Sequence, residues 1–180
     1  MRKLSLLLAL VLLLSFTVHG STYSNTMEAD ALFTTEDLMD ATVAELSLAM
    51  ISGRLTSQQL VQMYIDRIDA YDKSLGLNSI ISLNPTALED AKNADELLAS
   101  GRILGRLHGI PVLVKDNIDV AGMATPCGDI NRRYEIAHTD ARVITLLKNE
   151  GAIILGKTNM SEYAVSGAES SSTMGGTVHN

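Results

Sequence analysis

Residues 108–117 have the sequence HGIPVLVKDN, in which a short apolar run ends at Lys115. β-Branched residues lead into the lysine and turn-forming residues follow it, a pattern typical of a buried strand that ends in a loop. Such a strand would carry an amine from the core to the edge of a cleft. An amine held there partly dry can lose its proton near neutral pH and act as a base. Lys115 is therefore the candidate catalytic residue; a lysine that extends its amine to water at a strand end is the alternative.

The composition predicts a globular chain. Of its 180 residues, 46% are hydrophobic and 19% are charged, so we expect a packed core rather than disorder. The net charge of −7 argues against a basic face for nucleic acid, and we expect no nucleic-acid partner. Cys127 is the one cysteine, which excludes an internal disulfide framework.

The first twenty residues predict a cleaved secretory signal peptide. Arg2 and Lys3 form a short positive region, residues 4–18 form an apolar run, and compact residues precede Ser21. The run is shorter than the roughly 20 residues that a membrane span needs. We therefore expect a protein that is secreted or lies in the lumen of the secretory pathway, without a stable membrane span after cleavage. Removal of the leader leaves 12 basic residues against 21 acids, a net charge of −9.

The remaining pattern alternates helices with strands and predicts an α/β layer structure. Capping-box spacings at Thr42, Thr56 and Thr86 predict three helix starts, with residues 34–37 as an alternative start for the first, and Thr139-Asp140 predicts the cap of a fourth helix. Gly53 and Gly151 predict helix ends. Short apolar runs at 78–83 and 152–155, together with the run that ends at Lys115, predict strands. The segment 167–180 is rich in Gly, Ser and Thr and predicts a loop.

Apolar residues at helical spacing predict which faces turn to the core. They are Leu46, Met50 and Ile51 in the first helix; Leu60, Val61, Tyr64, Ile65, Ile68 and Tyr71 in the second; and Leu88, Ala91, Leu97 and Leu98 in the third, while the fourth carries Val143, Leu146 and Leu147.

Several other motifs are weaker. Residues 151–158 fit the phosphate-loop expression, but their four middle residues are Ala, Ile, Ile and Leu, which are strand material whose amides a sheet would use. We therefore reject a nucleotide site, and we expect no cofactor. The histidines lack zinc-binding spacing, and we interpret His108 and His138 as structural or exposed. Residues 170–172 are serines that could offer a nucleophile; we favour a hydrogen-bonding loop because no nucleophile-elbow motif surrounds them. Asn159-Met160-Ser161 is a glycosylation sequon directly after a buried-looking strand, and we expect it to be unused or partly used.

The chain from Leu107 onward resembles the amidase signature family. The residues that carry the resemblance are LHGIPVLVKDNI at 107–118, AGMAT at 121–125, Thr139-Asp140-Ala141 at the start of a helix, and EGAIILGKTNMSE at 150–162. The earlier helices, with Leu55-Thr56-Ser57, are also similar to the family's N-terminal part.

The resemblance implies a fold, an activity and a role for Lys115. It implies an α/β/α fold with a large mixed sheet, hydrolysis of linear carboxamides, and a Ser–cis-Ser–Lys triad. Lys115 falls on the triad lysine, which takes a proton from the nucleophilic serine through the bridging serine. A neutral amine is the species this needs, and a Ser–Lys pair is a known solution to acyl transfer. The substrate would be a small-molecule, lipid or peptide amide.

The chain also departs from the family pattern. Both triad serines lie in a Gly/Ser-rich segment shortly after a Gly-x-x-x-Asn-Pro stretch, and residues 176–180 (GTVHN) match the start of that stretch. We therefore expect a signal peptide at 1–20, a flexible N-terminus at 21–34, and an incomplete, N-terminal portion of an amidase domain at 35–180. Three functions stay open: a secreted amidase in a longer parent protein, with this chain inactive alone; a non-catalytic truncated fragment or partial gene model; and a glutamyl-tRNA amidotransferase A-like subunit. The signal peptide argues against the third function.

Overall fold

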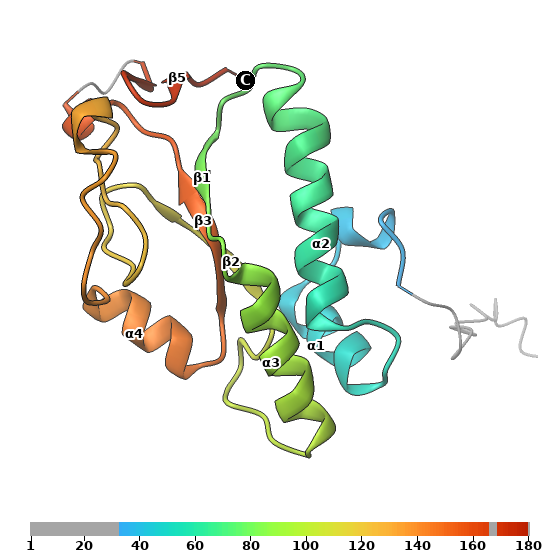
Figure 1. The fold of residues 1–180 in the computed structure, drawn as a ribbon. Coiled ribbons are helices and arrows are strands. Elements are labelled where there is room, and N and C mark those ends of the chain that lie inside the picture. Colours follow the sequence, from blue (N-terminus) through green and yellow to red (C-terminus); the bar gives the residue numbers. More distant parts are fainter. Residues whose placement is uncertain (1–32, 166–168, 180) are drawn as a thin grey trace, which may run out of the picture.

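The computed structural model describes residues 33–165 and 169–179 (Figure 1). Its helices are α1 (Val43–Ile51), α2 (Ser57–Arg67), α3 (Ala87–Ala99) and α4 (Arg142–Asn149), with a π-helical turn, η2 (Ile68–Lys73), after α2. Its strands are β1 (Ile80–Leu83), β2 (Pro111–Lys115), β3 (Ile153–Thr158), β4 (Ser171–Ser172) and β5 (Gly176–Thr177). The predicted signal peptide and most of the predicted flexible N-terminus lie outside the described residues.

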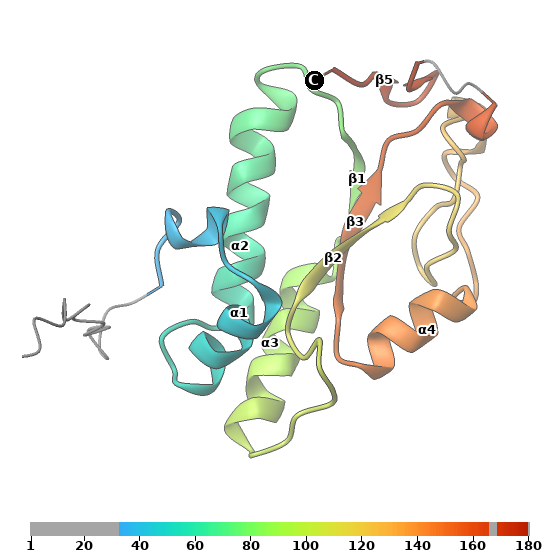
Figure 2. The ribbon, with the colours of Figure 1, turned by 180° about the vertical axis from the view of Figure 1, so that it is seen from behind.

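The sheet is mixed, as the resemblance implies. Its strand order is β1-β3-β2, in which β1 is antiparallel and β2 parallel to the central strand β3. Helix α4 covers one face and helices α2 and α3 cover the other (Figures 1 and 2). The predicted α/β fold with helices on both faces of a mixed sheet is therefore confirmed for this chain.

Buried apolar side chains fill both layers. On one face, Val61 of α2 and Ala91 of α3 pack with Leu155 of β3. On the other face, Ile144 of α4 packs with Val114 of β2. A third cluster joins α1 and α2 to the residue before β2, and its buried members are Leu38, Leu46, Ala49, Met50, Leu55, Leu60 and Ile110.

The local capping signals succeed at two helices and fail at two. Thr42 and Thr56 form full capping boxes with Glu45 and Gln59. Thr86 forms none, since its hydroxyl donates to the side chains of Asn84 and Asp90. The N-cap of α4 is Ala141 rather than Thr139 or Asp140. Residues 37–39 form a separate 3-10 turn, so the alternative start of the first helix is wrong.

Some predicted core positions are exposed in the described structure. Ile51, Tyr71 and Leu146 are exposed, whereas Ala94 and Ile144, which the periodicity did not single out, are buried. The apolar pattern of these helices is wider than the stripe that the helix contacts cover.

Two glycines fit the positions that the strand and helix ends require. Gly151 ends α4 with a φ of +87°, and a Cβ there would lie 2.7 Å from Cα of His108. Gly156 lies at a bulge where β3 carries an extra residue relative to β2, and a Cβ there would lie 2.5 Å from the carbonyl oxygen of Ser82. A larger residue at either position would displace backbone.

The C-terminal residues form a small hairpin rather than a plain loop. β4 and β5 pair antiparallel, with Ser171 opposite Thr177. We call residues 169–179 the terminal hairpin. In the same described ranges, no helix has both the length and the apolar character needed to cross a membrane.

Candidate active site

Lys115 is the last residue of β2, as predicted. It lies beside Thr158 of β3 in the parallel register, and the amide of Asp116 donates to the Thr158 carbonyl at 3.2 Å. Val114 belongs to the buried cluster under α4, so strand alternation directs Lys115 to the opposite face. The carboxyl end of a parallel strand is where α/β folds place catalytic groups.

In the described chain the Lys115 side chain is exposed, which differs from the expected partly dry amine. Its Nζ makes no hydrogen bond or ion pair to any described residue. β2 pairs with β3 alone, and its other edge has no neighbouring strand within residues 33–165 and 169–179. Leu113, two residues earlier on the same face, is 37% exposed for the same reason.

A second lysine, Lys157, is fully buried in the centre of the sheet. Its Nζ donates to the carbonyl of Ala124 and to Oγ1 of Thr125, both at 2.7 Å. Burial lowers the pKa of the Lys157 ammonium, while the charges of Asp116 and Asp119 oppose that shift. Its partners place it under the loop on the α4 face, away from the face to which Lys115 points.

Asp116 is buried beside this ammonium. Its Oδ2 accepts a hydrogen bond from the Gly128 amide at 2.7 Å, and Oδ1 has no hydrogen-bond partner among the described residues. Burial raises the pKa of Asp116, although the Gly128 hydrogen bond and the Lys157 charge act in the opposite direction. Lys157 and Asp116 thus fix the backbone that immediately follows Lys115.

The structure shows which of the three serines are engaged in the hairpin. Ser172 is buried; its hydroxyl donates to Oδ1 of Asn159 at 2.8 Å and accepts from the Gly175 amide at 2.8 Å. Ser171 accepts a hydrogen bond from Thr177. These contacts agree with the interpretation of this segment as hydrogen-bonding structure.

The segment that fits the phosphate-loop expression is strand, as predicted. Its middle residues belong to β3, and the Ile153 amide donates to the carbonyl of Ile110. Lys157, which would contact phosphate in such a loop, is instead enclosed by protein.

The histidine and cysteine positions are those of structural residues. His108 is buried, with Nε2 3.0 Å from the Ala94 carbonyl and Nδ1 accepting from the Leu104 amide, so its structural interpretation is confirmed. Cys127 is a free thiol in a turn with a φ of +57°. Within the described ranges, no group of three or more His, Cys, Asp or Glu side chains could hold a metal ion.

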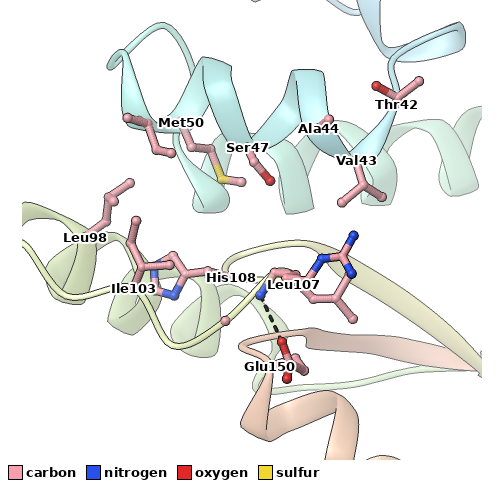
Figure 3. A pocket seen from close by; sticks show the side chains of 13 residues that line it. Thr42, Val43, Ala44, Ser47, Met50, Leu98, Ile103, Leu107, His108 and Glu150 are labelled. Atoms are coloured by element: carbon pink, nitrogen blue, oxygen red, sulfur yellow. Dashed lines mark hydrogen bonds between the residues drawn. The ribbon is translucent and has the colours of Figure 1, made fainter.

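An apolar cavity of about 880 Å³ lies at the opposite end of the sheet from Lys115 (Figure 3). It opens between α1 and residues 103–108, with Glu150 at its floor, where Oε2 accepts a hydrogen bond from the Arg106 amide. These residues precede the first residues of β2 and β3, whereas Lys115 ends β2. The cavity and the candidate base therefore do not form one site.

Together, the layered fold and a lysine at a parallel strand end define an α/β protein with the base side of an acyl-transfer site. The family model for Amidase matches residues 59–180. The chain belongs to this family, the amidase signature enzymes.

Solved structures of this family share the fold. The peptide amidase of Stenotrophomonas maltophilia has a TM-score of 0.74 and 41% identity, over 78% of this chain and 30% of that enzyme. An amidase family protein from Bacillus anthracis has a TM-score of 0.67 and 39% identity, over 71% of this chain and 26% of that protein.

Curated relatives include a glutamyl-tRNA(Gln) amidotransferase of Clostridium acetobutylicum, in which the A-type polypeptide is the part that matches. That polypeptide is 38% identical over 130 residues, which are 72% of this chain and 27% of the relative. The chain therefore spans little more than a quarter of the length of the curated relatives it matches.

The sequence patterns missed Lys157, Asp116 and Asn159 as parts of one end of the sheet. A signal was present, because a lysine that directly follows the apolar run of β3 has no adjacent water unless the strand end is open. Its partners come from residues 116–128, and no local pattern pairs those residues with β3.

Proposed function

We propose that this chain forms the base-bearing part of an amidase that hydrolyses linear carboxamide C–N bonds. The observation that carries the proposal is the position of Lys115, at the carboxyl end of β2 in a segment that belongs to the amidase family. The two serines of the implied Ser–cis-Ser–Lys triad would come from sequence that follows residue 180 in a longer protein.

The proposed chemistry assigns one task to Lys115. The neutral amine accepts the proton of the nucleophilic serine, relayed by the bridging serine, as that serine attacks the amide carbonyl. The proton then passes to the leaving nitrogen as the C–N bond breaks, and water releases the acyl group by the same relay. Lys115 must be neutral at the start, which requires that the remaining fold cover the exposed edge of β2.

The test uses a chimera in which this chain replaces the aligned segment of the S. maltophilia peptide amidase. We expect the chimera to hydrolyse a peptide amide, and Lys115→Ala to lower kcat by about 100-fold or more, as for the loss of a general base. Lys92→Ala is the matched control, because Lys92 is an exposed lysine on α3. A Lys115→Ala chimera with unchanged kcat would refute the assignment.

The 180-residue chain gives a second test. We expect no amidase turnover from it, because the implied serines are not in it. Turnover that disappears in Lys115→Ala would contradict the proposal and indicate a nucleophile within the chain, with residues 170–172 as the first to substitute.

An ammonia-transferring function is the second candidate. Curated relatives at 36–39% identity are named as glutamyl-tRNA(Gln) amidotransferases, and this favours it. The predicted signal peptide argues against it, because tRNA is charged outside the secretory pathway. Fusion of residues 1–32 to a reporter decides this point: secretion supports the first candidate, and retention in the cytosol supports the second.

A further inference from the structure

Asn159, directly after β3, uses the whole hydrogen-bonding capacity of its carboxamide. Its Nδ2 donates to the carbonyls of Asn78 at 2.9 Å and Gly176 at 3.2 Å. Its Oδ1 accepts from Oγ of Ser172 and from the amide of Met160, both at 2.8 Å. Two carbonyls on the nitrogen side and two donors on the oxygen side fix the orientation of the amide, since a flip would oppose like groups at all four contacts.

These contacts join three separate segments of the chain. Asn78 precedes β1, and Ser172 and Gly176 belong to the terminal hairpin. The hairpin backbone packs directly on the amide, since a Cβ on Gly175 would lie 2.5 Å from Nδ2. Asn78 adds a reciprocal bond from its own Nδ2 to the Thr177 carbonyl at 3.1 Å.

Hydrogen bonds, rather than apolar packing, hold the terminal hairpin in place. Among its described residues Ser172 alone is buried, and none belongs to a hydrophobic cluster of the core. Its other contacts are polar, including the Met174 amide with the Gly128 carbonyl at 3.0 Å and the His179 amide with the Leu77 carbonyl at 2.8 Å. The amide at the centre of this network therefore has a large influence on the position of the hairpin.

The clamp lies at the same end of the sheet as Lys115. Lys115 lies beside Thr158, and Thr158 precedes Asn159 in the chain. The hairpin crosses this end of the sheet, above the ends of β1 and β3 (Figures 1 and 2).

We infer that Asn159 is a positioning residue that holds the terminal hairpin against the Lys115 end of the sheet. The catalytic part of this inference rests on the proposed function: the clamp sets the point from which the chain leaves toward the serines that Lys115 would serve. Asn159 touches no reacting atom in this scheme and acts through the hairpin.

Hydrogen exchange on the 180-residue chain tests the clamp without any need for catalysis, with a soluble fusion partner if the chain precipitates. We expect Asn159→Ala and Asn159→Asp to accelerate exchange of the Gly175, Val178 and His179 amides by about tenfold or more, as for the loss of two hydrogen bonds. Aspartate should not rescue, because it keeps the acceptor and presents a second oxygen to two carbonyls. Asn93→Ala and Asn93→Asp, on the exposed face of α3, are the matched controls.

Local opening is distinguished from general unfolding by the amides of β3. The clamp predicts that the hairpin amides accelerate while those of Ile153 and Leu155 change far less. Equal acceleration everywhere, or unchanged hairpin amides, would overturn it. If the Asn159 variants do not fold, Ser172→Ala removes one contact from the hairpin side, and unchanged exchange there would also overturn the clamp.

The chimera tests the catalytic consequence. We expect Asn159→Ala to lower kcat between about tenfold and about 100-fold with KM little changed, as for a displaced catalytic group. A loosened hairpin with unchanged kcat would overturn the positioning role. If the unsubstituted chimera is folded but inactive, the proposed function fails, while the exchange experiment still decides the clamp.

Discussion

Lys157 is an ammonium enclosed by protein where β3 ends. Its two hydrogen bonds reach a carbonyl and a hydroxyl in the loop after β2, and the nearby carboxylate of Asp116 balances its charge. Removal of one member of a buried charged pair leaves the other in a low-dielectric site, which is far costlier than removal of both.

We therefore predict that Lys157→Met destabilises the chimera by about 3 kcal/mol and that adding Asp116→Asn recovers part of this loss. Urea unfolding of the two variants and the parent measures both changes. Lys92→Met, at an exposed site, should change the free energy of unfolding by less than about 0.5 kcal/mol. A Lys157→Met chimera as stable as its parent would show that the buried ammonium has no structural role.

The commitments of Asn159 lead to a second prediction at the residue scale. Both N–H groups of its amide donate within the fold, and Nδ2 is the atom to which a glycan would attach. We expect the folded chain, expressed through a secretory pathway, to carry no glycan at Asn159. The mass of the Asn159 peptide before and after glycosidase treatment measures this. Arg133→Thr creates a sequon at the exposed Asn131 and is the positive control; a folded product with a glycan at Asn159 contradicts the prediction.

At the scale of the elements, hydrogen bonds within a few residues were predictable and long-range ones were not. The boxes at Thr42 and Thr56 form because their partners lie three residues away. Asp140 fails as the cap of α4 because the Ala121 amide, 19 residues earlier, and Lys148 occupy its carboxylate. The same limit applies to the site, where the place of Lys115 at a strand end was predictable from its own segment and the Asn159 clamp was not.

Asp72 shows how one side chain orders the entry to β1. It is 4% exposed and accepts hydrogen bonds from the Ser79 amide at 2.7 Å, the Ser79 hydroxyl and the Ile80 amide at 3.2 Å. Burial alone would raise the pKa of Asp72, but these hydrogen bonds outweigh it and lower the pKa below its ordinary value. Because the folded pKa lies below the unfolded value near 3.9, the carboxylate stabilises the fold above that pH. The contribution is lost as the pH falls through the folded pKa.

We predict that Asp72→Asn destabilises the chimera by about 1–2 kcal/mol at pH 7, with a difference from the parent that shrinks below pH 4. Urea unfolding at a series of pH values measures it. Asp69→Asn, at an exposed position in the same turn, is the control. A loss for Asp72→Asn that is equal at pH 7 and pH 3 would exclude the charged hydrogen bonds as its origin.

At the scale of the whole molecule, the sheet has an open side. β2 is paired along one edge only within the described residues, and apolar side chains including Leu48, Ile51, Leu113 and Leu146 are exposed. Unpaired strand edges and exposed apolar surface both favour association with other chains.

We predict that the purified 180-residue chain is unstable or associates when it is alone. Light scattering during size-exclusion chromatography should show species larger than a monomer, and heating should give no cooperative transition. A monomer with one sharp thermal transition would overturn this prediction and show that the described core suffices.

The strand order has a consequence for how the chain acquires its fold during synthesis. β1 and β2 do not pair with each other, and each finds its partner in β3 alone. β3 is made last of the three, so the sheet cannot assemble until residues 153–158 have left the ribosome. Until then the nascent chain holds two strands without partners, beside helices that have already formed their local contacts. The ribosome therefore releases a chain whose earlier half waits for its later half, and this interval is when a chaperone would be needed most.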